Sequence, residues 1–245
     1  HLVDVRHAHV VGPLAVGHQV GRLHHGVRIA GNIEERDSFF KNLGSSRPPG
    51  SLNQKDARAS LLWKPSDALT VLLKSEYDRT ASNGFAYKPL IGSTYYADAP
   101  ADPYTLDYDR KDLESTHESW RTGLEVRFQP SPDGVTFRSM SSYQKLSYDT
   151  ALDADGTSQK SIIEDGKTRY KRASQEFSIV SPDGLDFTYI VGAMYDWQRQ
   201  GLLQDTIYFD TAGDVRQQTH IDGVNTRKVA AVFSQAGYQL ASALQ

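Results

Sequence analysis

Residues 173–198 read ASQEFSIVSPDGLDFTYIVGAMYDWQ, and this stretch decides the fold class. Before the SPDG at 181–184, Phe177 and Ile179 alternate with polar side chains, and after it apolar or aromatic residues recur at every second position as far as Trp197. A period of two predicts β-strands with one apolar face. Pro presets φ, Asp bonds its own backbone and Gly supplies positive φ, so SPDG predicts a tight turn and the whole stretch a β-hairpin.

Two more hairpins follow the same pattern. One spans residues 57–77, and the other spans 123–144 around a second SPDG turn at 131–134. The recurrence of one turn sequence between strands indicates a repeated structural unit. Single strands are predicted at 26–35 and 227–240, which gives about eight strands and an all-β fold.

Long polar stretches separate these hairpins, at 80–118, 149–169 and 201–226. Compact soluble domains rarely hold several structureless loops above about 15 residues. Bacterial barrels, in contrast, place short turns on the periplasmic side and long loops outside the cell. We therefore predict an antiparallel up-and-down transmembrane β-barrel. Eight strands can close alone, but loops of this length favour about eight strands of a larger barrel.

The charged residues of these strands indicate which face would meet water. An Arg or Lys on the lipid face costs about 2–4 kcal/mol at the bilayer midplane, so we expect the alternating charges to face the lumen. These residues are Arg58, Lys74, Glu76, Glu125, Arg127, Arg138 and Glu176. Aromatic residues near strand ends are expected to form interfacial girdles; they are Trp63, Phe128, Tyr148, Trp197 and Tyr238.

Composition excludes several other classes of protein. No apolar run approaches the ~18 residues of a membrane-spanning helix. A net charge of -3 and a pI near 6.3 give no general attraction for nucleic acid, so no nucleic-acid partner is expected. The absence of cysteine excludes disulfides and thiolate metal sites.

Nothing in the sequence indicates catalysis. His117 and His220 are isolated in polar stretches, and no nucleophile motif or glycine-rich phosphate loop is present. We expect no enzyme activity, no catalytic residues and no cofactor.

Four stretches resemble TonB-dependent outer-membrane receptors. They are AGNIEERDSFFKN at 30–42, DARASLLWKPSDALTVLLKSEYD at 56–78, the opening stretch at 173–198, and FSQAGYQLASALQ at 233–245. The resemblance implies the outer membrane of a Gram-negative bacterium, with its lipid as a partner, and a barrel of about 22 strands filled by a plug. It further implies uptake of a scarce nutrient, with a ferric siderophore as the expected small-molecule ligand, energised by the TonB–ExbB–ExbD complex through the plug.

Two regions are expected along the chain. Residues 26–245 are a partial receptor barrel, and we expect the plug and the final strands to be absent. Residues 1–25 are an atypical segment with six of the eight histidines, at positions 1, 7, 9, 18, 24 and 25. This segment has three interpretations, which are a metal-binding tail, a shifted reading frame or mis-assigned start, and a divergent strand pair.

The candidate ligand-binding residues are tyrosines of the first long polar stretch. Aromatic surfaces with a few polar groups are common in binding sites, and we predict ligand contact for Tyr87, Tyr95, Tyr96, Tyr104 and Tyr108. The alternative for these rings is packing within the loop. The neighbouring carboxylates fit no calcium loop, so we expect a solvated segment and no metal site; they are Asp98, Asp102, Asp107, Asp109, Asp112 and Glu114.

Two other interpretations stay open at this point. The chain could be a small self-contained β-barrel or β-sandwich with an adhesion or structural role. It could also be a piece of a degraded gene without a function of its own.

Overall fold

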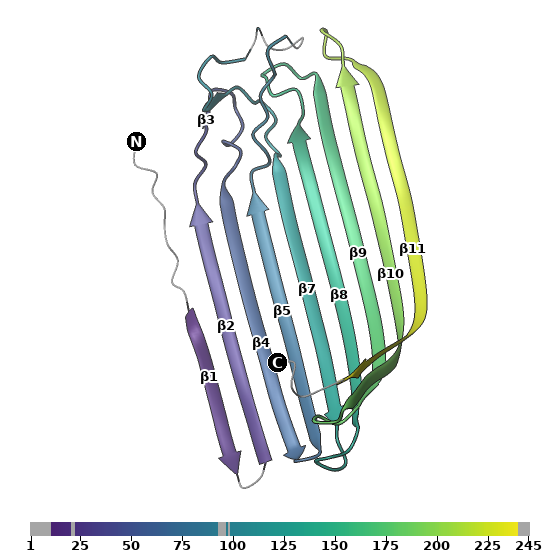
Figure 1. Ribbon diagram of the computed structural model, residues 1–245. Helices are drawn as coiled ribbons and strands as arrows, with labels where there is room; N and C mark the ends of the chain where they lie inside the picture. The colour runs from purple at the N-terminus through teal and green to yellow at the C-terminus, as the bar shows by residue number, and fades with distance from the viewer. Residues whose placement is uncertain (1–10, 21–22, 93–96, 98, 240–245) are drawn as a thin grey trace.

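The computed structural model describes residues 11–20, 23–92, 97 and 99–239, and most of these form one antiparallel sheet (Figure 1). In chain order, which is also sheet order, its nine strands are β1 (Val11–Val20), β2 (Leu23–Arg36), β4 (Leu52–Ser66), β5 (Leu69–Ser82), β7 (Glu114–Phe128), β8 (Thr136–Asp153), β9 (Ile162–Val180), β10 (Phe187–Phe209) and β11 (Val215–Tyr238). The predicted all-β, up-and-down antiparallel arrangement is confirmed. Among the described residues, no helix is long and apolar enough to cross a membrane.

The loops gather at one end of the sheet and the tight turns at the other (Figure 1). Short turns join β4 to β5, β7 to β8 and β9 to β10, as the Pro-rich and SPDG sequences predict. The loops between β2 and β4 and between β5 and β7 lie at the opposite end. These two loops pair through a short parallel ladder of β3 (Lys41–Asn42) and β6 (Thr105–Leu106).

Two of the three predicted long loops are mostly strand. β8 and β9 extend to Asp153 and from Ile162, and β10 and β11 reach Phe209 and start at Val215. The loops that remain are therefore only 154–161 and 210–214. Alternation of apolar and polar residues identifies a strand in a sequence, and the residues at the loop-side ends of these four strands do not alternate in this way.

The first strands also differ from the prediction. The strand predicted at 26–35 begins at Leu23, and it pairs with β1 from Val20↔Leu23 to Val11↔Gly31. The segment predicted to be atypical therefore contains one strand of the sheet and the start of the next. His1, His7 and His9 lie outside the described residues.

The two faces of the sheet have opposite chemistry. Cross-strand register places all seven predicted lumen charges on one face, which we call the concave wall. Examples are the opposed pairs Arg58↔Glu76 and Met140↔Glu176. The other face, which we call the convex face, carries the large apolar side chains, and these are exposed; they include Val27, Ile29, Leu61, Trp63, Leu73, Trp120, Leu124, Phe128, Phe137, Tyr143, Phe177, Ile179, Val191, Tyr195 and Val232.

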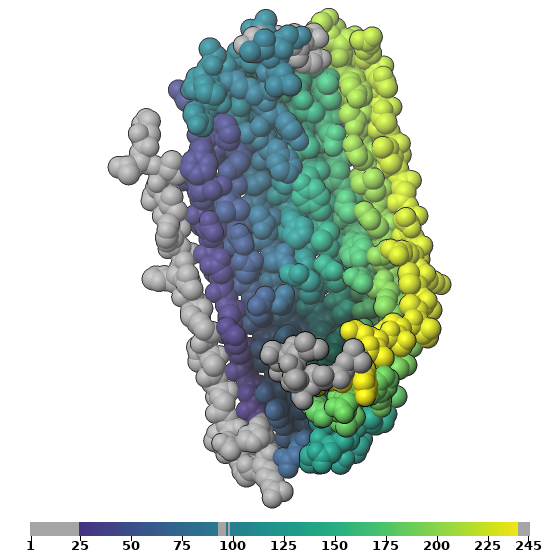
Figure 2. Space-filling model, in the orientation of Figure 1, coloured from purple at the N-terminus to yellow at the C-terminus, as the bar shows by residue number. Residues whose placement is uncertain are grey.

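Burial follows the curvature of the sheet, which bends into a trough (Figure 2). Several polar side chains on the concave wall are buried: Ser119, Ser178 and Asp196 are 3%, 4% and 6% exposed. On the convex face Phe177 is 60% exposed. This distribution is the reverse of that in a water-soluble protein. Within the described residues β1 and β11 are the edges, and the sheet does not close.

Two residues of the predicted strands lie on an unexpected face. Tyr148, predicted as a girdle residue, is on the concave wall opposite His117, whereas the other four predicted girdle aromatics are on the convex face. Phe233 is also on the concave wall, directly over Gly192. A Cβ on Gly192 would stand 2.5 Å from the Phe233 ring, so glycine leaves the space that this ring occupies.

Candidate functional site

The loop end of the sheet is held together by contacts between loops that are far apart in the sequence. We call this assembly the loop cap, and it comprises residues 37–51, 83–92, 97, 99–113 and 154–161. Asn42 is its main cross-link. Its Nδ2 donates to the carbonyl oxygen of Tyr108 (2.8 Å) and to Ser46 Oγ (2.8 Å), and its Oδ1 accepts from the Tyr108 amide (2.7 Å). One side chain thus fixes two loops whose residues are 66 positions apart.

Tyr108 is the buried centre of the loop cap. Its side chain has no exposed surface, its hydroxyl donates to the carbonyl oxygen of Tyr87, and the Tyr87 amide donates to that same hydroxyl. Burial raises the pKa of the Tyr108 phenol above its ordinary value. Fully enclosed and satisfied, Tyr108 packs the loop and does not reach a ligand in this conformation.

The other predicted tyrosines lie at the surface of the loop cap or outside the described residues. Tyr87 is 42% and Tyr104 is 63% exposed, and each has an aromatic neighbour, Phe85 at 6.2 Å and Phe40 at 6.3 Å between ring centroids. Tyr95 and Tyr96 fall outside the described residues. The structure therefore presents two accessible aromatic pairs to the solvent at this end of the sheet.

A buried arginine joins the loop cap to β8 and β9. The Arg110 side chain is only 8% exposed, and its guanidinium contacts Asp112 (2.8 Å) and Asp165 (2.5 Å) and donates to the carbonyl oxygens of Leu152 and Glu164. Burial disfavours its charge, but the hydrogen bonds that the guanidinium donates to these two carboxylates outweigh burial and raise the pKa of Arg110. A hollow of about 350 Å³ opens beside this group.

Two adjacent carboxylates organise the loop at 154–161. Asp155 accepts from the amides of Thr157, Ser161 and Ile162 and from the Thr157 hydroxyl, all within 3.0 Å. Gly156, at φ +73°, lets this turn approach the Tyr87 carbonyl, because a Cβ there would stand 2.9 Å from that oxygen. Asp153 is buried beside them, and burial, helped by the charge of Asp155, raises its pKa to about 7.

The raised pKa of Asp153 predicts a pH-dependent loop. Its pKa is about 7 in the folded loop and near 4 when the loop opens, so stability present below pH 4 is lost as the pH rises towards 7. One proton per opening event raises the opening constant by up to about tenfold per pH unit between pH 5 and 6. Hydrogen exchange of the amides at 154–161, corrected for intrinsic rates, measures this directly. Asp153→Asn should remove the pH dependence, and an unchanged profile in that variant would contradict the assignment.

Two of the carboxylates predicted to be solvated accept hydrogen bonds within the loop cap, and Asp98 lies outside the described residues. Asp102 accepts from Thr105 Oγ1 (2.7 Å), and Asp109 accepts from the Ser45 amide (3.0 Å). Hydrogen bonds from Thr105 and the Tyr104 backbone lower the pKa of Asp102. No group of His, Cys, Asp and Glu within the described ranges could hold a metal ion.

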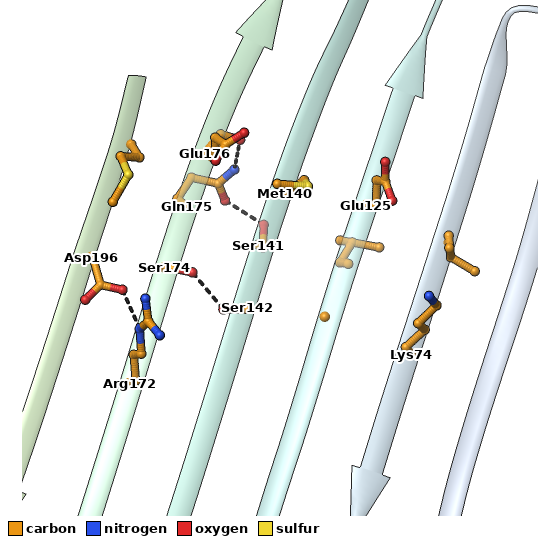
Figure 3. A pocket seen from close by; sticks show the side chains of 14 residues that line it. Lys74, Glu125, Met140, Ser141, Ser142, Arg172, Ser174, Gln175, Glu176 and Asp196 are labelled. Carbon is orange, nitrogen blue, oxygen red and sulfur yellow. Dashed lines mark hydrogen bonds and ion pairs between the residues drawn. The ribbon is translucent and has the colours of Figure 1, made fainter. Parts of the chain in front are cut away.

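A second hollow lies on the concave wall. It measures about 430 Å³, and Lys74, Glu125, Met140, Glu176 and Asp196 are among its lining residues. Figure 3 shows Arg172 turned towards Asp196, and their atoms Nε and Oδ2 are 2.6 Å apart. Ser142 and Ser174 also bond across β8 and β9 at 2.7 Å. The wall is therefore polar, charged and largely paired.

Sequence reasoning did not identify the residues that hold the loop cap. Asn42, Arg110 and Asp155 act through partners distant in the chain or through backbone amides. The DADG sequence at 153–156 is a turn signal that could have marked Asp155. The local sequence does not mark Arg110 as a buried residue, because three of its four partners, Leu152, Glu164 and Asp165, lie 42 to 55 residues away.

No protein-family model matches the chain. Among solved structures, it is similar to the ferric yersiniabactin uptake receptor FyuA from Yersinia pestis, with a TM-score of 0.58 and 12% identity over 94% of this chain and 42% of that one. It is also similar to the siderophore receptor PiuA from Acinetobacter baumannii (TM-score 0.57, 14% identity, 91% and 37%) and to the ferric citrate transporter FecA (0.55, 14%, 92% and 32%). The likeness shows the fold, and the chain spans less than half the length of each of these proteins.

Proposed function

We propose that the chain forms part of the β-barrel of a TonB-dependent receptor in the outer membrane of a Gram-negative bacterium. One observation carries the proposal, which is the reversed distribution of polarity between the two faces of the sheet. Exposed rings such as Phe177 (60%) and Trp63 (50%) cover the convex face, whereas Asp196 is 6% exposed on the concave wall. Large contiguous apolar surfaces mark contacts with a membrane or a partner. Strands whose side chains alternate in this way would have lipid against the convex face and a polar lumen against the concave wall, and this accounts for the chemistry of both faces.

The proposed activity is uptake of a scarce nutrient, and the proposed nutrient is a ferric siderophore. Its support is the fold shared with three solved uptake proteins for ferric chelates or siderophores and the resemblance of the four quoted stretches. In this proposal the aromatic pairs of the loop cap meet the ligand, and TonB–ExbB–ExbD supplies energy through a plug region. A β-sandwich is disfavoured, because it needs a second packed sheet to cover the apolar face, and the described residues form one large sheet.

Membrane fractionation followed by ligand binding tests this proposal. Cells that express the protein are separated into soluble, inner-membrane and outer-membrane fractions, and we expect the protein in the outer membrane, resistant to carbonate extraction. Outer-membrane samples are then titrated with ferric siderophores and with their iron-free forms. Recovery of the folded protein in the soluble fraction would overturn the location. Binding to none of the ferric siderophores tested would overturn the ligand class.

Variants of the loop cap tyrosines test whether these rings contact the ligand. Tyr104→Ala and Tyr87→Ala should each raise the Kd about tenfold, roughly 1.4 kcal/mol, because each removes an exposed ring. Tyr104→Phe should bind nearly as tightly as the wild type if the ring makes the contact. Tyr195→Ala, on the convex face, is the matched control and should leave the Kd unchanged. Equal effects of Tyr195→Ala and Tyr104→Ala would argue against contact at the loop cap.

A further inference from the structure

A row of three basic side chains crosses the convex face. Lys145 on β8 lies directly opposite Lys171 on β9, and Lys171 lies directly opposite Arg199 on β10. All three side chains are exposed. We call them the basic row. Lys228 on β11 lies close to its end, opposite Trp197.

The register places the basic row at the border of the apolar surface. Two residues towards the turns, the same strands carry Tyr143, Ala173 and Trp197 at directly opposed positions. Two residues towards the loops, the neighbours are Ser147, Arg169 and Gly201, so the face becomes polar. The row therefore stands where an apolar belt with aromatic rings ends and a hydrated surface begins.

The basic row lacks the carboxylate partners that five arginines of the concave wall have. Across the residues that the structure describes, no side-chain hydrogen bond and no ion pair involves Lys145, Lys171 or Arg199. On the concave wall, in contrast, arginines stand within 4 Å of a carboxylate; these are Arg58, Arg121, Arg127, Arg138 and Arg172. On the convex face nearby, Asp149 is already paired with Arg169 at 2.7 Å, which leaves Glu118 as the adjacent free carboxylate.

Like charges at directly opposed strand positions destabilise a sheet. An external anion bound across the three side chains would relieve this repulsion, because Glu118 supplies only one carboxylate at one end of the row. Carboxylates and phosphates both fit, but a phosphate carries more charge on one compact group and meets several cations at once. The spacing of adjacent strands, about 4.8 Å, lets one such group contact two of these side chains.

A groove beside the basic row indicates an amphiphile. It measures about 300 Å³ and is lined by Glu118, Trp120, Tyr143, Lys145 and Ser147. Lys145 shares this groove with two aromatic rings, of which Trp120 is 51% and Tyr143 43% exposed. Rings of this kind sit at the boundary between acyl chains and headgroups. A free anion would use the cations alone, whereas a lipid would use the cations and the groove together.

We propose that the basic row and its groove bind the phosphorylated headgroup of an anionic membrane lipid, with the acyl chains along the apolar belt. This inference rests on the proposed function only in placing the convex face against lipid. Lys145, Lys171 and Arg199 neutralise the phosphate, and Trp120 and Tyr143 flank the glycerol or sugar and the first methylenes. The site is separate from the loop cap and from the concave wall.

The test compares lipids that share their acyl chains and differ in the charge of the headgroup. The purified protein in neutral detergent is titrated with short-chain phosphatidic acid, with phosphatidylcholine of the same acyl chains, and with inorganic phosphate, and bound lipid is counted by native mass spectrometry. We expect phosphatidic acid to bind at least tenfold more tightly than phosphatidylcholine, and inorganic phosphate at the same concentration not to displace it. Displacement by inorganic phosphate would overturn the lipid assignment.

Charge-matched variants locate the site. The triple variant Lys145→Gln, Lys171→Gln, Arg199→Gln should lose the preference for phosphatidic acid. The control Arg47→Gln, Lys111→Gln, Arg216→Gln removes the same charge from exposed positions at the loop end and should keep it. In phosphatidylcholine alone, the first variant should melt at the same temperature as the wild type or higher, because it relieves repulsion. If the triple variant kept its preference for phosphatidic acid, or melted at a lower temperature than the wild type in phosphatidylcholine alone, the proposal would be overturned.

The two proposals fail separately. If the protein inserts into membranes and binds no ferric siderophore, the transport proposal falls and the lipid site is still measured. If siderophore binding is intact while the triple variant retains its preference for phosphatidic acid, the lipid site alone falls.

Discussion

Leu73→Arg is expected to destabilise the membrane-inserted protein by about 2–4 kcal/mol, the cost of a cationic side chain at the midplane of a barrel. Leu73 lies on the convex face near the middle of the apolar belt, directly opposite Leu61 and Leu124. It is 37% exposed, so an arginine there would meet lipid instead of a protein partner. Urea unfolding of the protein refolded into phosphatidylcholine vesicles measures the change.

Leu72→Arg is the matched control, because it is the same substitution one residue away on the same strand. Leu72 lies on the concave wall opposite Glu125 and lines the hollow of about 430 Å³. An arginine there would reach water and a carboxylate, so we expect a loss below about 1 kcal/mol. Similar losses for the two variants would contradict the assignment of the faces, and with it the barrel geometry.

Arg110→Ala is expected to open the loop cap, with a loss of about 1–3 kcal/mol in local stability. The substitution leaves the carbonyl oxygens of Leu152 and Glu164 without their donor and separates the loop at 99–113 from β8 and β9. The loss stays below that of a fully buried ion pair, because Asp165 is 48% and Asp112 is 74% exposed. Hydrogen exchange should increase in the loop at 99–113 and in 154–161, while β4 and β5 stay protected.

Two substitutions separate the charge of Arg110 from its geometry. Arg110→Lys keeps the charge but cannot contact both carboxylates and both carbonyl oxygens, so we expect most of the loss to persist. Asp112→Ala removes the more exposed partner and should change local stability by less than about 1 kcal/mol. An Arg110→Lys variant with wild-type exchange would show that charge alone holds the loop cap.

The sequence was sufficient to predict both faces of the strands near the apolar belt. The charges from Arg58 to Glu176 fall on one face, since an uncompensated charge on an apolar face is costly and side chains alternate strictly. It was insufficient at the loop-side ends of β8 to β11, where apolar and polar residues do not alternate. Tyr148 illustrates the limit, because an aromatic ring at a strand end is consistent with either face until the register is known.

The candidate site was less predictable than the fold. Five tyrosines in one polar stretch indicated an aromatic surface, but composition cannot tell which ring is enclosed. Tyr108 is enclosed because Asn42, 66 residues earlier, fixes its backbone and Tyr87 satisfies its hydroxyl. The basic row could not be predicted from the sequence either, because Lys145, Lys171 and Arg199 become neighbours only through the pairing of three strands.

Each strand of the large sheet pairs only with the sheet strands next to it in the chain, and this affects the order in which the protein folds. Because the nine strands of the large sheet follow each other in chain order, each new hairpin can pair with the existing edge strand at a small cost in loop-closure entropy. The links from Asn42 to Tyr108 and from Arg110 to Asp165 span 66 and 55 residues. These long-range links are therefore expected to form after the strands beneath them. The loop cap would then fold last and would hold the loops together after the sheet has formed.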